Sequence, residues 1–236
     1  MSKSTRICLG PDLLDQMSPT DPKAIASRRD IKRINFVMFQ DAIMRSVISR
    51  SGVVSPKRVL DLGGGDATFT LNVVRRMNPQ WRGVELVVVD RVDVVEPQTR
   101  IEFKKLGWDL KVVTSDVFAF LEHAEPRSFD LVLSNLFIHH FPADSLAKLL
   151  AMIASLTTSF VACEPRRSSL TVAGSAMLWA IGCTPVSVRD SVTGARAGFT
   201  ASEISELWPD HNSWDLFEYD KGLFSHCFVS CRRSNA

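Results

Sequence analysis

Residues 56–164 alternate five short apolar runs with segments of helical periodicity, and this alternation restricts the fold more than any other feature of the sequence. The runs are rich in Val and Leu and lack a regular polar–apolar alternation, as is typical of strands buried on both faces of a parallel sheet. Strands separated by helices at this interval predict βαβ units and an open parallel sheet. The predicted strands are Arg58–Leu62, Glu85–Val89, Leu110–Thr114, Phe129–Leu133 and Ser159–Cys163.

The flanking segments predict helices and a closing hairpin. Apolar residues between Asp21 and Ser51 recur at three- and four-residue steps, which predicts one or two helices. Two strand-like runs that flank a turn at Gly222 predict an antiparallel hairpin. The elements expected after Glu164 are a helix, a loop, a short helix and two strands, at Leu170–Cys183, Asp190–Phe199, Ala201–Leu207, Trp214–Tyr219 and Phe224–Cys231.

These elements together predict an α/β fold with a Rossmann-like, seven-stranded, mostly parallel sheet, a C-terminal antiparallel hairpin and a helical cap. A chain of 236 residues is long enough for one such core. We expect an N-terminal helical arm in residues 1–55 and one domain in residues 56–236, with a cap insert at about 165–200.

Composition excludes several function classes. The net charge of +2, without a run of Lys or Arg, argues against a nucleic-acid partner. The five cysteines form no CxxC pair and fit no metal module, so we expect no metal and a reducing compartment. The N-terminus lacks a secretory apolar core, and the longest apolar stretch is too short to span a bilayer. The sequence therefore predicts a cytoplasmic protein without a membrane partner.

A glycine-rich turn joins the first predicted strand to the following helix, within Val59–Thr70. Gly63 and Gly65 allow a sharp turn and a close approach to a ligand, because neither has a Cβ. The first amides of the next helix would then face an anionic group such as a carboxylate. The alternative is a tight connection without a ligand.

Polar residues end the next three predicted strands. Asp90 can accept hydrogen bonds from ribose hydroxyls, and Asp116 can accept one from an adenine amino group, which Val117 and Phe118 would cover. Asn135 lies at the end of the fourth strand. Each residue alone also fits a cap or turn position. Together they match the rule that open α/β sheets bind ligands at the carboxyl ends of their strands.

These segments resemble the motifs of class I S-adenosylmethionine-dependent methyltransferases. Asp61, Gly63 and Gly65 match the acidic-x-Gly-x-Gly-x-Gly pattern of that family, with Ala67 in place of the third glycine. The resemblance covers 57–164 and implies S-adenosyl-L-methionine as the cofactor. Its methionine part would lie near the first three residues, its ribose near Asp90 and its adenine near Asp116. The remaining residues expected at the cofactor are Gly64, Arg91, Ser115, Val117, Asn135 and Leu136.

A nucleotide-dependent dehydrogenase is the competing enzyme class. Its Gly-x-Gly-x-x-Gly fingerprint requires a final glycine where this chain has Thr68, and Asp61 within the first strand is atypical of it. The turn therefore favours the methyltransferase.

His139 and His140 follow the fourth predicted strand and are candidate bases for deprotonating an acceptor hydroxyl. The pair resembles the His-His-Phe found there in many small-molecule and quinone methyltransferases. We expect methyl transfer to a hydroxyl of a small, largely apolar or aromatic metabolite of the secondary-metabolite type. The alternatives are C-methylation of a quinone or polyketide-like acceptor, and a non-catalytic cofactor-binding homologue.

Candidate acceptor contacts come from the arm, the end of the fifth strand and the insert. Met and aromatic residues there can form an apolar wall, and Arg residues can bind an anionic group. A structural ion pair is the alternative for Glu164 and Arg167. The predicted acceptor residues are Phe39, Glu164, Arg167, Trp179 and Arg196, with Met38, Met177 and Phe199 as further wall residues. A homodimer remains an open alternative to a monomer.

Overall fold

The computed structural model describes residues 6, 12–77 and 81–233. Seven strands form one sheet in the order β3-β2-β1-β4-β5-β7-β6. The first five run parallel, and β7 pairs antiparallel with both β5 and β6. The strands are β1 (Arg58–Leu62), β2 (Val84–Asp90), β3 (Trp108–Thr114), β4 (Leu131–Asn135), β5 (Ser159–Pro165), β6 (Trp214–Lys221) and β7 (Ser225–Arg232). The predicted fold class is confirmed.

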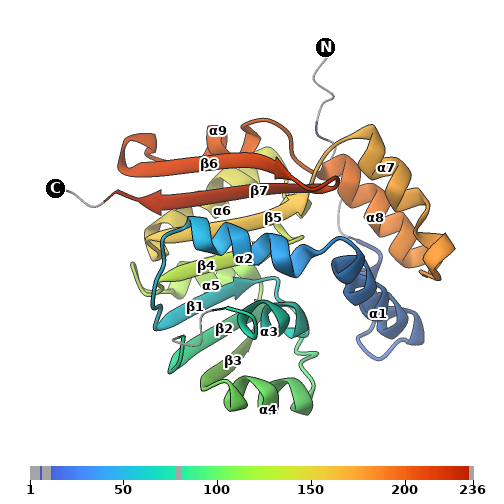
Figure 1. The fold of residues 1–236 in the computed structure, drawn as a ribbon, viewed down its shortest axis with the longest axis horizontal. Coiled ribbons are helices and arrows are strands. Elements are labelled where there is room, and N and C mark those ends of the chain that lie inside the picture. Colours follow the sequence, from blue (N-terminus) through green and yellow to red (C-terminus); the bar gives the residue numbers. More distant parts are fainter. Residues whose placement is uncertain (1–5, 7–11, 78–80, 234–236) are drawn as a thin grey trace.

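Helices cover both faces of the sheet (Figure 1). On one face α2 (Gln40–Arg50), α3 (Thr68–Val74) and α4 (Pro97–Lys105) pack on the apolar side chains of the strands. On the other face lie α5 (Val117–His123), α6 (Ala143–Leu156) and α9 (Glu203–Leu207). Met44 and Ile48 of α2 are almost fully buried in the first core, so the second helix of the predicted arm is integral to the domain.

Three further helices form a cap beside the sheet, on the right of Figure 1. They are α1 (Pro22–Val37), α7 (Ser169–Ala176) and α8 (Pro185–Ala197). The Asp30 carboxylate of α1 accepts hydrogen bonds from the Thr184 amide at 2.7 Å and the Ser187 hydroxyl at 2.8 Å, which ties α1 to the start of α8. The arm and the insert therefore form one unit. No helix in the described ranges is long and apolar enough to cross a membrane.

Three sequence predictions of local structure were wrong. The expected loop Asp190–Phe199 is mostly helical, because Pro185 at the first turn and the Thr184 side-chain cap start α8, which continues to Ala197. The expected helix Leu170–Cys183 is divided into α7 and a 3₁₀ turn, η3 (Leu178–Ile181), which ends at Gly182 with φ 80°. The fourth strand starts two residues later than predicted and ends on Asn135 itself.

Candidate active site

The carboxyl ends of β1, β2, β3 and β4 lie at one rim of the sheet. Their register sets Leu62 beside Val89 on one side and Ser134 on the other, and Asp90 beside Thr114. The residues that follow these positions along the chain include the predicted cofactor residues. Parallel pairing therefore brings those residues to a common edge, as the strand order requires.

Each glycine of the turn is required for a different reason. Gly63 has φ 70° and lies against Phe137, whose ring would be 2.3 Å from an added Cβ. An added Cβ at Gly64 would meet the Asp61 carboxylate at 2.6 Å. Gly65 has φ 55°, and an added Cβ there would meet nothing within 4 Å. Gly65 therefore faces open space that a ligand could occupy, whereas the Phe137 ring already occupies the space beside Gly63.

Asp61 is buried beneath the turn, with 2% of its surface exposed. Its carboxylate accepts a hydrogen bond of 2.5 Å from the Thr70 hydroxyl of α3. Burial raises the pKa of Asp61 to about 7, opposed by this hydrogen bond and reinforced by the nearby Asp90 carboxylate. Asp61 is therefore a buried acid that titrates near neutrality at the base of the site.

Asp90 connects the end of β2 to the glycine turn. Its Oδ2 accepts a hydrogen bond from the Gly65 amide at 2.9 Å, and its Oδ1 accepts a longer one from the Val92 amide at 3.3 Å. Asp90 is partly exposed, so its carboxylate retains acceptor positions toward the rim.

Asp116 is the N-cap of α5. Its Oδ1 accepts hydrogen bonds from the amides of Phe118 and Ala119 at 2.9 and 3.4 Å. Its Oδ2 lies 3.9 Å from the Arg91 guanidinium, and half of the Asp116 side chain is exposed. The capping alternative is thus correct for one oxygen, while the other faces Arg91. Of the neighbouring predicted residues, the Ser115 hydroxyl donates to the Asp116 carbonyl, and Val117 is buried.

Asn135 and Leu136 form the end of β4. The side-chain Oδ1 of Asn135 accepts a hydrogen bond from Gln40 Nε2 at 3.2 Å. Leu136 has φ 54°, a conformation that is costly for a residue with a Cβ, and its amide donates to the Cys163 carbonyl of β5. The backbone therefore changes direction directly after β4.

Glu164 and His139 form a buried pair beside this turn. Glu164, on β5, is fully buried and accepts a 2.6 Å hydrogen bond from His139 Nδ1. The same carboxylate accepts hydrogen bonds from the amides of Phe137 and Ile138, each at 3.1 Å, and of His139 at 3.4 Å. Nε2 of His139 faces Gly194 of α8, where an added Cβ would lie 3.1 Å away. Glu164 thus fixes both the loop and the orientation of the imidazole.

His140 has a different environment. Its ring centroid lies 4.1 Å from that of His139, and its Nε2 lies 3.9 Å from the Asp12 carboxylate. Burial, followed by the proximity of His139, lowers the pKa of His140 to about 2, despite a hydrogen bond to the Leu136 backbone. His140 is therefore a neutral, very weak base at physiological pH.

The predicted acceptor residues are not gathered in one place. Arg167 binds Glu203 with two hydrogen bonds of 2.5 and 2.9 Å and donates to the Gly198 carbonyl, so its guanidinium forms the structural ion pair. Arg196 is exposed on the last turn of α8. Phe39 and Trp179 are 70% and 69% exposed on the cap. The predicted wall residues are also not together: Phe199 is fully buried, whereas Met177 is exposed.

Sequence reasoning missed two contacts that attach the arm to the site. Gln40 is fully buried and joins Asn135 to the Ser225 hydroxyl of β7. Lys32 of α1 lies 2.6 Å from the Asp66 carboxylate in the glycine turn. Gln40 is a polar residue at the start of an otherwise apolar helix face, and this pattern could have indicated its buried contact. No local pattern in the sequence indicates the contact of Lys32.

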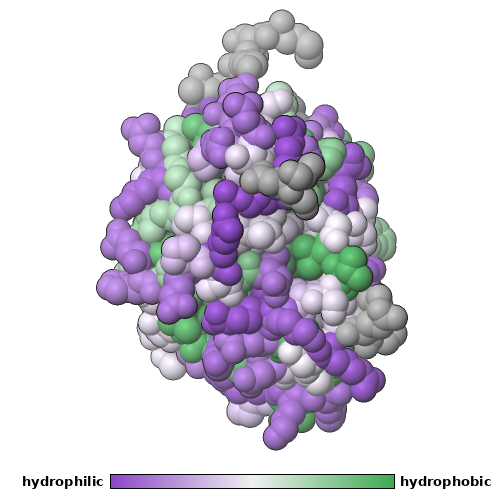
Figure 2. Space-filling view, turned by 90° about the vertical axis from the view of Figure 1, so that its left-hand side faces the viewer, coloured by the Kyte–Doolittle hydropathy of each residue, from purple (hydrophilic) through white to green (hydrophobic). Residues whose placement is uncertain are grey.

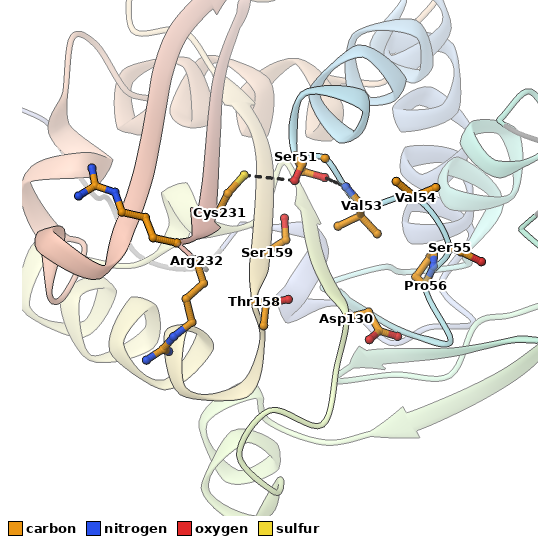
Figure 3. A pocket seen from close by; sticks show the side chains of 12 residues that line it. Ser51, Val53, Val54, Ser55, Pro56, Asp130, Thr158, Ser159, Cys231 and Arg232 are labelled. Carbon is orange, nitrogen blue, oxygen red and sulfur yellow. Dashed lines mark hydrogen bonds between the residues drawn. The ribbon is translucent and has the colours of Figure 1, made fainter. Parts of the chain in front are cut away.

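A separate cavity lies at the opposite end of the strands (Figure 3). Its volume is about 460 Å³, and its lining includes Ser51, Asp130, Ser159 and Arg232. Ser159 and Glu164 occupy opposite ends of β5, so this cavity is distinct from the rim. None of the predicted site residues lines it.

Comparisons with known proteins agree with this geometry. Residues 59–159 match the family model described as a methyltransferase domain. The fold is similar to that of the plantazolicin methyltransferase BpumL, solved with SAH, with a TM-score of 0.61 and 14% identity over 93% of this chain and 94% of that chain. The plantazolicin methyltransferase BamL matches with a TM-score of 0.61 and 15% identity, over 91% of this chain and 93% of that chain.

A structure titled as an O-methyltransferase from Nostoc punctiforme matches with a TM-score of 0.58 and 14% identity over 94% of this chain. The present chain spans 64% of the length of that protein. No curated protein matches the sequence. At these identities the structural likeness establishes the fold.

Proposed function

We propose that this chain is a class I S-adenosylmethionine-dependent methyltransferase and that it methylates a hydroxyl group of a small, largely apolar or aromatic metabolite. The methyltransferase domain that residues 59–159 match and the fold shared with solved methyltransferases support the proposal. The observation that carries the hydroxyl target is the buried hydrogen bond between His139 Nδ1 and Glu164.

The rim has the groups that this cofactor requires. Gly65 faces open space, and the carboxylates of Asp90 and Asp116 lie at neighbouring strand ends, each with acceptor capacity left for the nucleoside. Asp61 lies directly below the turn that would meet the methionine part. The bound cofactor supplies an electrophilic methyl group on a sulfonium, and the protein contributes alignment of the acceptor.

His139 is the proposed base for the acceptor's proton. The Glu164 carboxylate accepts from Nδ1, which favours the tautomer with its proton on that nitrogen and its lone pair on Nε2. When Nε2 takes the hydroxyl proton, Glu164 stabilises the resulting imidazolium, and the oxygen gains nucleophilicity. The low pKa of His140 makes it unsuited to this role.

The acceptor would bind beside η2 (Ile138–His140) and the cap, and its access to His139 requires α8 to shift, because Gly194 packs against Nε2 and His139 is 4% exposed. Nε2 of His139 faces α8, and the exposed aromatic rings of Phe39 and Trp179 belong to the cap elements. Apolar and aromatic walls with few polar groups suit an aromatic or aliphatic acceptor. Arg196 stays a proposed anion contact on α8.

Titration with S-adenosylhomocysteine tests the cofactor assignment. We expect one site on the wild type, with affinity reduced by roughly a hundredfold in Asp90→Ala, because two charge-assisted hydrogen bonds to the ribose are lost. Asp93→Ala is the matched control, since Asp93 is an exposed carboxylate three residues away that pairs with Arg100. No binding to the wild type would refute the methyltransferase assignment.

Turnover measurements test the base. His139→Ala should lower kcat by about 10² or more at unchanged cofactor affinity, whereas His123→Ala, at an exposed histidine of α5, should not. Equal rates for all three proteins would show that His139 is not the base, and a wild type that binds cofactor without turnover on any acceptor would indicate a non-catalytic homologue.

C-methylation of a quinone or polyketide-like acceptor is the second candidate. The His139–Glu164 pair would also accept a proton from an acidic carbon. The position of the transferred methyl group in the product, determined by NMR, separates the two reactions.

A further inference from the structure

Exposed apolar side chains are concentrated on the cap. Among the residues that the structure describes, twelve large apolar side chains are exposed, and nine of them lie in two cap segments. We call these nine residues the cap patch: Ile25, Ile31, Phe36, Val37 and Phe39 from α1 and the junction to α2, with Leu170, Met177, Trp179 and Ile181 from α7 and η3. Phe36, at 79%, is the most exposed of them. Exposed apolar side chains gathered on one part of a molecule make that part a candidate interaction surface.

The two cap segments adjoin each other. The Arg33 guanidinium of α1 donates to the Gly182 carbonyl, directly after η3, at 3.4 Å. The Ser27 and Ser187 hydroxyls, from α1 and α8, share a buried hydrogen bond of 3.0 Å. In Figure 1, α1, α7 and α8 stand together at one end of the molecule. The patch is therefore carried by one packed unit.

The helices that carry the cap patch are rich in basic residues. The helices α1, α7, η3 and α8 carry seven Lys or Arg and two acidic residues, although the whole chain has a net charge of only +2. Both acidic residues are engaged by hydrogen bonds: Asp30 is buried against Thr184, and Asp190 accepts from the backbone amides of Leu13 and Leu14. The cap thus presents an excess of positive charge beside apolar side chains.

We propose that the cap patch docks peripherally on an anionic lipid bilayer. Aromatic and aliphatic side chains at helix ends, flanked by Lys and Arg, are the combination that enters a headgroup region, and the basic residues are complementary to anionic lipids. The face at the opposite end of the molecule is mainly hydrophilic (Figure 2), which orients the protein with the cap toward the lipid. This differs from the sequence-based expectation of no membrane partner, which considered only spanning segments.

Docking through the cap would bring the bilayer beside the elements that cover the proposed site. Lys32 of α1 contacts Asp66 in the glycine turn, and Gly194 of α8 faces His139, so the docking elements also cover the site. An apolar hydroxy compound dissolved in the membrane would then need only a shift of α8 to approach His139. This step rests on the proposed function, whereas vesicle binding itself does not require turnover.

Vesicle co-sedimentation of the full chain tests the docking. We expect binding to vesicles of phosphatidylcholine mixed with phosphatidylglycerol, weak binding to phosphatidylcholine alone, and loss of binding in high salt. Lys23→Glu with Arg29→Glu should weaken binding at least about tenfold. Phe36→Ser with Ile181→Ser should do the same, because the inserted apolar area is removed.

The matched controls are Lys104→Glu and Ile101→Ser, at exposed positions of α4 outside the cap. They should bind like the wild type, and S-adenosylhomocysteine affinity should be equal in all variants, which separates a failure of docking from a failure of the proposed function.

Three results would overturn the proposal. The first is no binding to anionic vesicles at low salt, and the second is equal weakening by the cap and α4 variants. The third is a stable dimer, detected by light scattering, that Phe36→Ser with Ile181→Ser dissociates, because the patch would then be a subunit interface.

Discussion

Replacing Asp61 with Asn should change how the stability of the protein depends on pH. In the folded protein burial raises the pKa of Asp61 from 3.8 to about 7, so the native state keeps this proton between those values while the unfolded chain releases it. Folding therefore becomes less favourable as pH rises through that window. The contribution of Asp61 to the free energy of unfolding falls by about 1.4 kcal/mol per pH unit and by about 4 kcal/mol in total.

Urea denaturation from about pH 4.5 to pH 7.5 measures this effect. Asn cannot ionise, so the difference in unfolding free energy between Asp61→Asn and the wild type should shift in favour of the variant as pH rises, and should level off above about pH 7. The Thr70 hydrogen bond can be kept by the amide oxygen, which limits the constant offset.

Asp93→Asn provides the control, because Asp93 is an exposed carboxylate. The difference in unfolding free energy between Asp93→Asn and the wild type should not rise with pH in this way. A wild type and an Asp61→Asn variant with parallel pH profiles would refute the argument that burial holds the proton on Asp61.

Three further predictions follow from neighbouring contacts. Calorimetry in buffers of different ionisation enthalpy should show proton release from Asp61 when S-adenosylmethionine binds below about pH 7, because its ammonium favours the carboxylate; zero release in the wild type would contradict this. Gly194→Ala should lower kcat, because its Cβ would lie 3.1 Å from His139 Nε2, while the melting temperature should change little, because the helix preference of Ala offsets part of this crowding. Burial lowers the pKa of His226, but hydrogen bonds to two carboxylates outweigh it and raise this pKa above 6.5 in the folded protein. The contribution of His226 to the free energy of unfolding is therefore complete below about pH 6.5 and is lost as pH rises through the pKa of the folded state. His226→Gln should remove that fall in unfolding free energy, and an unchanged profile would contradict it.

Several elements were predictable because their signals are local. Runs of Val and Leu identified the strands of the parallel sheet, since a strand buried on both faces needs apolar residues throughout. Asp90 and Asn135 were placed correctly at the rim, because each ends a strand and parallel strands share one direction. The loop predicted at Asp190–Phe199 was wrong, because Gly194 in this segment lies against His139 inside a helix and not in a turn.

The sequence by itself determined the strand–turn–helix order, the open parallel sheet and the edge at which a ligand would bind, because periodicity and glycine placement act over a few residues. Only the tertiary structure decided that His139 is hydrogen-bonded to Glu164, Gln40 to Asn135, and Arg167 to Glu203. These pairs join residues that are 25 to 95 positions apart. Their meeting depends on strand register and helix docking, which no local pattern encodes.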